Sequence, residues 1–289
     1  MPATVGFAKE SDLPALKEIW SQCFGGPEAY RDFYYSRRFK PEDTLVARAD
    51  GQAAAMLTLM AVTLAGEQGC YIYAVATLPR FQGQGLQQML GEFSIQEMRR
   101  RGMKFCCLVP ADPGLFSFYS KFGYQADFFR WEKRVTGADI PPGFKPILFG
   151  HCGYRTFAAL REGYLGRIGR AAAHPEPELR YIYDELCNFQ GAVVRFTEDG
   201  QERYAAYNAC DGRIYLQEQS GRDPEAVLWS LMLRHGIWNG RCTSAEYFPR
   251  ALHMPYGMGR LLDRPESPAA PRTLSAWLGG EGYMSLMLD

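Results

Sequence analysis

Residues 71–86 read YIYAVATLPRFQGQGL, so that an apolar strand pattern leads directly into a turn with two glycines. Apolar side chains then recur at helical spacing, at Leu86, Met89, Leu90 and Phe93. This spacing predicts a helix, whose first N–H groups lack partners within the helix and lie at the positive end of its dipole. Gly83 and Gly85 have no Cβ and let the backbone come close to a ligand. The segment therefore predicts an anion site for a phosphate or pyrophosphate.

Strand and helix patterns alternate on both sides of this turn. The expected elements are strand 4–8, helices 12–23 and 28–39, strands 45–49, 53–64 and 71–77, helix 86–101, strand 104–109, helix 112–123 and strand 124–134. Asp50 and Gly51 supply a hairpin turn between the second and third strands. The order predicts an α/β (α+β) fold with a mixed, mostly antiparallel sheet and flanking helices.

Two segments of this half resemble motifs of the GNAT superfamily of acyl-CoA-dependent N-acetyltransferases. The turn RFQGQG at 80–85 resembles the family's Q/R-x-x-G-x-G pattern, and LFSFYSKFGY at 115–124 is similar to its FYxKxGF segment. Two motifs at the expected separation are far more specific than either one alone. The resemblance covers about residues 4–134 and implies the GNAT fold for this part of the chain.

The resemblance also implies how acetyl-CoA would be held. The turn would bind the pyrophosphate mainly through backbone N–H groups, and the preceding strand would separate from its neighbour and pair with the pantetheine. One freed amide of that strand would polarise the thioester carbonyl. The implied cofactor-binding residues are Val75, Ala76, Thr77, Arg80, Gln82, Gly83, Gln84, Gly85 and Leu86. Arg80 could instead be a solvated surface charge.

Tyr119 occupies the position of the tyrosine that protonates the departing CoA thiolate in the family. Its aromatic neighbours also allow the simpler interpretation of a packed tyrosine with a satisfied hydroxyl. A general base is not identified, because the strand position at which some family members carry a glutamate is Gly69 here. A water chain and three carboxylates remain candidates for the base, namely Glu67, Glu28 and Asp32.

The second half repeats the order of the first. We expect a catalytic GNAT domain at 1–135, a linker at 136–150 that is rich in proline and glycine, and a degenerate GNAT-like domain at 151–289. In this second domain the turn before the helix, at 220–224, reads SGRDP and lacks the second glycine, and Asp223 would repel a phosphate. The second domain is therefore expected not to bind CoA. The alternative is that a common meander-plus-helix pattern occurs twice by chance.

The last eight residues, 282–289, are apolar enough to form a buried strand. Asp289 carries two carboxylates at the end of this segment, its side chain and the chain terminus. The chain is similar to multi-unit acetyltransferases of the enhanced-intracellular-survival type, which place the C-terminal carboxylate in the acceptor site. The similarity implies that Asp289 is a candidate catalytic residue that attracts the ammonium group. Alternatively, Asp289 caps an edge strand in solvent.

Composition excludes several classes of protein. Lys and Arg total 32 and Asp and Glu total 32, so the net charge of zero gives no global attraction to nucleic acid or to an anionic membrane. The longest weakly polar stretch, 53–66, is shorter than the ~20 residues of a membrane helix. The eight cysteines form no CxxC and fit reduced thiols in a cytoplasmic protein, and the four histidines show no metal-ligand spacing. We therefore expect no metal.

These observations together predict an enzyme that transfers an acetyl group from acetyl-CoA to a small-molecule or peptide amine by direct attack in a ternary complex. Two other functions remain open. One is an aminoacyl-tRNA-dependent peptidyltransferase, since such enzymes also use tandem GNAT-like units. The other is a non-catalytic acyl-CoA sensor. The sequence indicates neither the acceptor amine nor the oligomeric state.

Overall fold

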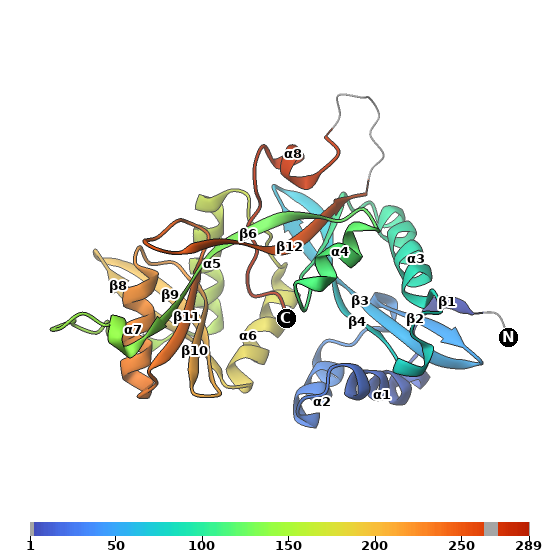
Figure 1. Cartoon of the computed structure of the whole chain (residues 1–289), viewed down its shortest axis with the longest axis horizontal. Coiled ribbons are helices and arrows are strands. Elements are labelled where there is room, and N and C mark those ends of the chain that lie inside the picture. The colour runs from blue at the N-terminus through green and yellow to red at the C-terminus, as the bar shows by residue number, and fades with distance from the viewer. Residues whose placement is uncertain (1–2, 263–270, 289) are drawn as a thin grey trace. The chain divides into compact units, whose positions relative to one another are not determined.

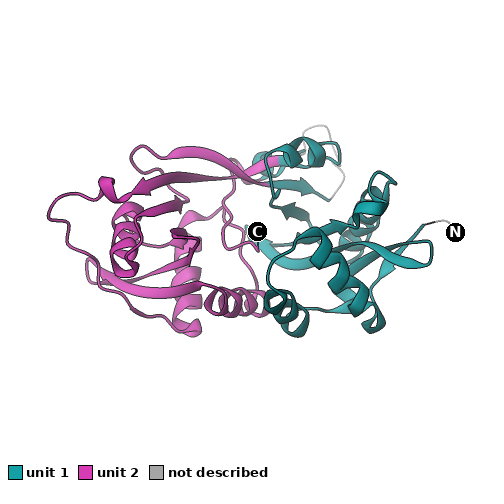
Figure 2. Ribbon diagram, turned by 60° about the horizontal axis from the view of Figure 1, so that its bottom comes forward, with its two compact units in different colours: residues 1–125, 258–277 teal, residues 126–257, 278–289 magenta. Residues whose placement is uncertain are grey.

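The structure is a computed structural model and describes residues 3–262 and 271–288 (Figure 1). Contacts divide the chain into two compact units, which Figure 2 shows in different colours. Unit 1 comprises Met1–Gln125 and Met258–Trp277, and unit 2 comprises Ala126–Gly257 and Leu278–Asp289. This division differs from the expected segments 1–135 and 151–289, because residues 258–277 return to unit 1.

Unit 1 is built on a mixed sheet of six strands in the order β1-β2-β3-β4-β5-β12. Its strands are β1 (Thr4–Phe7), β2 (Thr44–Ala49), β3 (Gln52–Leu64), β4 (Glu67–Thr77), β5 (Phe105–Leu108) and the last residues of β12 (Leu252–Leu261). The helices are α1 (Leu13–Cys23), α2 (Glu28–Arg37), α3 (Leu86–Arg100), α4 (Gly114–Ser120) and most of α8 (Leu274–Leu278). Neighbouring strands are antiparallel, except that β4 and β5 are parallel. The expected fold class is confirmed.

Helices α1 and α3 cover opposite faces of this sheet. Trp20 of α1 packs edge-to-face on Tyr73 of β4, with the ring centroids 6.1 Å apart. The neighbouring Ile72 instead lines a cavity together with Ile95 of α3. Consecutive residues of a strand point to opposite faces, so the two helices lie on different sides of β4. The apolar runs of β2 and β3 are buried between them, as Leu45 illustrates with no exposed surface.

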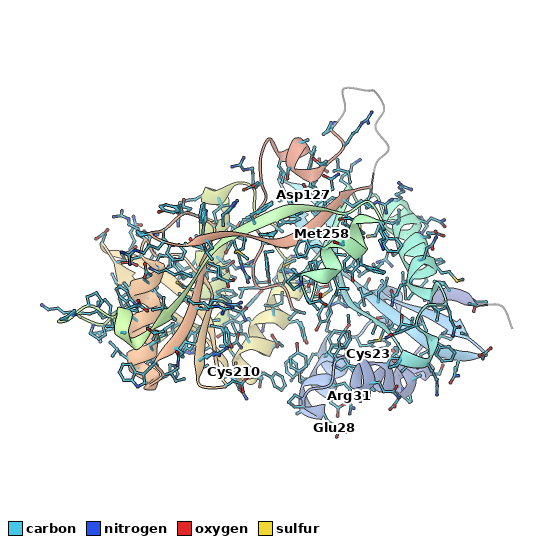
Figure 3. The ribbon with its side chains drawn as sticks, viewed as in Figure 1. Cys23, Glu28, Arg31, Asp127, Cys210 and Met258 are labelled. Atoms are coloured by element: carbon cyan, nitrogen blue, oxygen red, sulfur yellow. The ribbon has the colours of Figure 1, made fainter. Side chains whose placement is uncertain are left out.

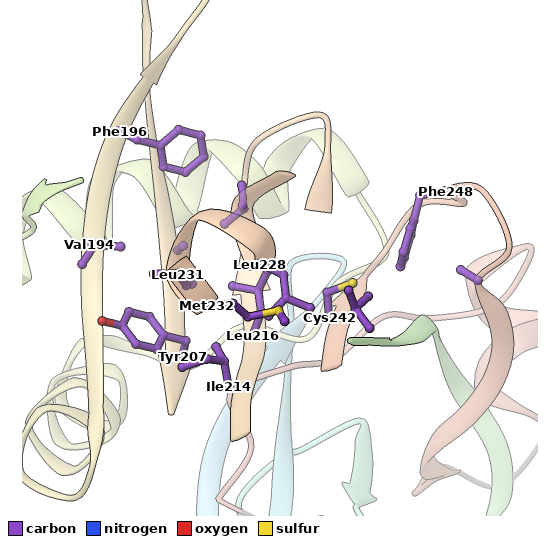
Figure 4. Packing of buried hydrophobic residues seen from close by; sticks show 14 residues of the cluster. Val194, Phe196, Tyr207, Ile214, Leu216, Leu228, Leu231, Met232, Cys242 and Phe248 are labelled. Carbon is purple, nitrogen blue, oxygen red and sulfur yellow. The ribbon is translucent and has the colours of Figure 1, made fainter. Parts of the chain in front are cut away.

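Unit 2 repeats the element order that follows β1 in unit 1. It contains α5 (Tyr154–Ile168), α6 (Glu176–Asn188), β8 (Gly191–Glu198), β9 (Gln201–Cys210), β10 (Arg213–Gln219), α7 (Pro224–His235) and β11 (Asn239–Ser244). Strand β6 (Gln125–Thr136) lies between β11 and β12, whose residues up to Gly257 belong to unit 2, and β7 (Gly150–His151) lies beside β8. Strands β10 and β11 are parallel, like β4 and β5. Side chains of β8, β10 and α7, including Val194, Leu216 and Leu228, meet in one apolar core (Figure 4).

The expected linker, 136–150, contains one short 3-10 turn at Gly137–Asp139 and then an irregular segment up to β7. The strand expected at 124–134 is observed as β6, but all of it except Gln125 belongs to unit 2. Its pairing explains the difference, because β6 is antiparallel to β11 over six residue pairs from Asn239–Thr136 to Ser244–Trp131.

The end of the chain is docked in unit 2, as expected. Residues 283–288 are buried, and Gly282 and Tyr283 form parallel bridges with Phe128 and Ala171. The segment thus makes isolated bridges rather than the expected strand. Its anchor is a buried ion pair, in which Arg161 donates to Glu218 at 2.8 Å while Ser285 donates its hydroxyl to the same carboxylate. Asp289 lies outside the described residues.

Within the described ranges, the structure contains no helix that is both long and apolar enough to span a bilayer. The same ranges hold no cluster of three or more potential metal-ligating side chains.

Candidate active site

The edge of β4 opens at its C-terminal end. Pairing with β5 joins Gly69–Tyr71 to Phe105–Cys107 and goes no further along the two strands. On its other side β4 remains paired with β3 up to Thr77, which lies opposite Ala55. The later residues of β4, which include Val75, Ala76 and Thr77, therefore lie beyond the pairing with β5. Among the described strands, none pairs with that side of β4 beyond Tyr71, so a ligand can lie along the strand there.

A β-bulge in the β3–β4 pair lies in the part of β4 that is no longer paired with β5. The register of β3 and β4 shifts between the pairs Thr58–Tyr73 and Met56–Ala76, so that Ala74 and Val75 together oppose one residue of β3. Ala74 has a positive φ of 51°, which is unfavourable for a residue with a Cβ by roughly 1–2 kcal/mol. Bulges redirect peptide and side-chain groups and are frequent beside active sites. The bulge thus changes the direction of the peptide groups next to Val75.

A cavity of about 290 Å³ lies between α3, α4 and the separating strands. Val75 of β4 and Tyr119 of α4 both line it, as do Gln87 and Gly91 along one face of α3. The structure thus brings together the open strand edge and the tyrosine that the sequence had singled out in separate motifs.

Burial keeps the Tyr119 hydroxyl protonated, since it raises the pKa of this group to about 12. The ring packs against Phe118 and Tyr124, at centroid distances of 5.2 and 6.0 Å. Nothing in the described parts of the chain accepts or donates a hydrogen bond at this hydroxyl. A neutral phenol in a cavity is a suitable proton donor.

The glycine-rich turn ends at the N-terminus of α3, as expected from the sequence. Gly83 and Gly85 have φ values of 74° and 78°, and Gly85 is the N-cap residue of the helix. For the residues that the structure describes, no acceptor is bonded to the backbone N–H groups of residues 83–85. Leu86 is buried and anchors the first turn of α3 to the core. The turn thus presents free donors at a helix N-terminus, which is the arrangement of an anion site.

Side chains of the same turn hold its shape. Gln82 donates to the Thr77 carbonyl at 3.2 Å, and Gln84 donates to the Arg80 carbonyl at 3.3 Å. Arg80 is exposed and donates to Gln52 at 3.0 Å. Its guanidinium remains at the surface beside the turn, where its charge favours an anion.

Gln87 is a site residue that the sequence analysis missed. Its amide donates to the Ala76 carbonyl at 2.9 Å and to the Thr77 hydroxyl at 2.7 Å. These two bonds fix the open edge of β4 to the first turn of α3. In the sequence, the signal for Gln87 was its position two residues after Gly85, the last glycine of the motif.

The structure explains why no glutamate occupies position 69. A Cβ on Gly69 would come within 2.3 Å of the buried Phe105 ring, so a side chain there requires the core to move. Among the other candidate bases, Glu67 is exposed at the start of β4. Glu28 is exposed on α2 near Arg31 (Figure 3).

Asp32, also on α2, is a poor base. Hydrogen bonds from Lys17 at 2.9 Å and Arg31 at 3.2 Å lower its pKa below the usual value for an aspartate. A lower pKa means a weaker proton acceptor, so the pairing works against general-base catalysis by this carboxylate.

In unit 2, carboxylates already accept the backbone N–H groups of the corresponding turn, at 220–224. Asp223 caps α7 and accepts from the N–H groups of Glu225 and Ala226 at 3.0 Å each, and Pro224 has no N–H group. Glu198 accepts from the N–H group of Arg222 at 3.1 Å. The donors that a phosphate would need are therefore occupied by carboxylates, which also repel it.

Comparisons with known proteins agree with this geometry. Residues 4–126 match the family model described as an acetyltransferase (GNAT) domain. A GCN5-related N-acetyltransferase from Kribbella flavida is 18% identical with a TM-score of 0.68, and covers 91% of this chain and 72% of its own. A protein of unknown function from Enterococcus faecalis, described as a probable N-acyltransferase, is 15% identical with a TM-score of 0.71, covering 91% and 73%.

Eis1 from Mycobacterium abscessus is 14% identical with a TM-score of 0.63, and covers 91% of this chain and 74% of its own. The curated proteins include no match. At these identities the solved structures establish a shared fold, which extends over both units, and the family model establishes the class of the first. The chain therefore carries a GNAT acetyltransferase domain, which spans residues 4–126.

Proposed function

We propose that this protein is an N-acetyltransferase that transfers an acetyl group from acetyl-CoA to an amine in a ternary complex. The observation that carries the proposal is the position of Tyr119 and Val75 in one cavity, at the point where β4 leaves β5. The free donors of residues 83–85 at the start of α3 support the same function, because a CoA pyrophosphate needs such donors.

The reaction needs three groups in the site: a donor to the carbonyl oxygen, an acid for the sulfur and a base for the amine proton. The neutral amine nitrogen attacks the thioester carbonyl carbon, and the negative charge that develops on the carbonyl oxygen is stabilised by an amide of the bulged strand near Val75. The carbon–sulfur bond then breaks, the sulfur takes a proton from Tyr119, and the amine proton leaves to a base, after which Tyr119 regains a proton from solvent. The products are an amide and free CoA.

An amine panel tests this function. Purified protein with acetyl-CoA is offered small-molecule and peptide amines, and the released CoA thiol is measured. Amine-dependent release is expected for at least one class of acceptor. Binding of acetyl-CoA without any release would instead favour a sensor, and release with aminoacyl-tRNA alone would favour a peptidyltransferase. A cytoplasmic location remains our prediction from the cysteines.

One acetyl-CoA is expected to bind per chain. The turn at 80–85 has free N–H donors, whereas Asp223 and Glu198 occupy those of the turn in unit 2. Titration calorimetry with acetyl-CoA measures the number directly. Two equivalent sites per chain would contradict the degenerate character of the second unit.

We propose that the carboxylate of Asp289 acts on the acceptor amine. Deleting residues 288–289, or extending the chain with a tag, should raise the KM for the amine far more than the KM for acetyl-CoA. Thermal unfolding is the control, since Leu288 is buried and its loss also affects unit 2. A tagged protein with full activity and unchanged stability would rule out this role.

A further inference from the structure

The cavity of unit 1 extends to two arginines at the end remote from the glycine-rich turn. Gln87 and Arg99 both line it from α3, and twelve residues of helix span roughly 18 Å. Arg260 lines it from β12, where its backbone lies opposite Cys106 of β5. Arg99 is the first of three consecutive arginines at the C-terminal end of α3, and it contributes to the wall of this cavity.

Both guanidinium groups retain donors that have no anionic partner. Arg99 donates through Nε to the Leu262 carbonyl at 2.7 Å, and Arg260 donates through Nη1 to the Phe122 carbonyl at 2.6 Å. Considering residues 3–262 and 271–288, neither arginine forms an ion pair with a carboxylate. Each therefore keeps part of its planar fork for a further acceptor.

The guanidinium charges of Arg99 and Arg260 both act on the Cys106 thiol. Burial raises the pKa of the Cys106 thiol to about 11, and the Tyr124 hydrogen bond and the charges of Arg260 and Arg99 oppose this effect. The Cys106 sulfur lies 3.2 Å from the Tyr124 hydroxyl, and Tyr124 lines the same cavity as the two arginines. Arg99 donates to the carbonyl of Leu262, which follows Arg260 by two residues, so the two arginines line the same end of the cavity, where one anionic group can meet both.

One acidic side chain, Glu92, lines the same cavity and reduces its positive charge. It is seven residues before Arg99 on α3, which corresponds to roughly 10 Å along the helix. Its carboxylate accepts from the amide of Gln88 at 2.9 Å. The arginine end of the cavity therefore remains positive, and Ile72, Ile95 and Leu108 form apolar walls between it and the bulge.

We infer that Arg99 and Arg260 form a second anion subsite, which binds an anionic group of the acyl-CoA donor other than its pyrophosphate. The inference rests on the proposed function. Arginine forks bind carboxylate and phosphate oxygens in pairs, and the positive charge strengthens such bonds. A carboxylate at the far end of a dicarboxylic acyl chain has this chemistry, and the apolar walls suit the connecting methylenes. The 3′-phosphate of CoA has it as well, but only the ribose separates it from the pyrophosphate at the glycine-rich turn, so we assign the subsite to the carboxylate.

The experiment has two arms that distinguish these sources. The first compares kcat/KM for butyryl-CoA, succinyl-CoA and glutaryl-CoA, which differ in the terminal carboxylate and in length. The second compares the Kd of CoA with that of 3′-dephospho-CoA by calorimetry. Both are measured on the wild-type protein, Arg99→Gln, Arg260→Gln and the double variant. Arg213→Gln, an exposed residue of unit 2, controls for the loss of charge.

A carboxylate subsite predicts that a dicarboxylic donor exceeds butyryl-CoA by ~10-fold or more in the wild type, and that the double variant loses this preference. A 3′-phosphate held by the arginines would instead weaken binding by ~10-fold when it is removed from the wild type, with no effect in the double variant, and this result would contradict the carboxylate subsite. A wild type with neither preference overturns the inference, whether or not the variants fold.

Arg99→Lys and Arg260→Lys provide a further check, because they keep the charge but lose the fork. They should retain only part of the preference, and thermal unfolding of every variant identifies any that are misfolded.

Failure of the proposed function gives a different set of results. In that case no donor yields amine-dependent CoA release, while the calorimetric comparison of CoA and 3′-dephospho-CoA still tests the phosphate source.

Discussion

Replacing Gly85 or Gly83 with valine is expected to raise the Kd for acetyl-CoA by ~100-fold or more. Both glycines have a positive φ and free space around the Cβ position in the ligand-free chain. A side chain would therefore occupy the volume that the pyrophosphate needs and would strain the turn that presents the N–H donors. The loss of two hydrogen bonds to a charged group accounts for the expected magnitude. Calorimetry with acetyl-CoA measures the effect.

The control for this prediction is Gly200→Val. Gly200 has a φ of 73° and equally open space, but it lies in a hairpin turn of unit 2. The backbone strain is matched, so all three variants should lose similar thermal stability while the hairpin variant keeps its affinity for acetyl-CoA. If Gly85→Val binds acetyl-CoA as tightly as Gly200→Val, the turn is not the pyrophosphate site.

Replacing Tyr119 with phenylalanine is expected to lower kcat by ~10²-fold or more and to leave the affinity for acetyl-CoA nearly unchanged. The variant keeps the ring contacts with Phe118 and Tyr124 and removes only the proton donor. The pKa of about 12 keeps the hydroxyl neutral up to strongly alkaline pH. Loss of its proton should therefore not contribute to any decline in kcat between pH 7 and pH 10.

Steady-state kinetics with acetyl-CoA and a saturating amine measure this change, and Tyr247→Phe serves as the matched control on an exposed tyrosine of unit 2. An unchanged kcat for Tyr119→Phe would assign Tyr119 to the apolar packing of α4 and would require another donor for the thiolate.

The sequence predicted well those elements whose pattern is local. The apolar spacing after the glycine-rich turn predicted α3, and Asp50 and Gly51 predicted the β2–β3 hairpin, because each signal lies within a few residues of what it forms. Asp223 likewise indicated the blocked turn of unit 2, since a capping carboxylate and its donors are adjacent in the chain.

Features that depend on distant partners were not predictable. Nothing in residues 73–76 marks the bulge, which places an alanine in a conformation that glycine prefers. Phe105 of β5 excludes a side chain at Gly69 of β4. Arg99 and Arg260 line one cavity although 160 residues separate them in the sequence. Such contacts are set by tertiary packing, for which a single sequence has no periodic signal.

The return of β12 to unit 1 has a consequence for biosynthesis. Strand β5 pairs with β12 through residues 258–261, and Leu262 binds both Lys104 and Arg99. A nascent chain that has emerged only as far as α4 therefore has β5 as an unpaired sheet edge, which is a known site of wrong association. Unit 1 reaches its full set of hydrogen bonds only after the intervening residues of unit 2 have been translated. Its maturation is thus tied to the synthesis of nearly the whole polypeptide.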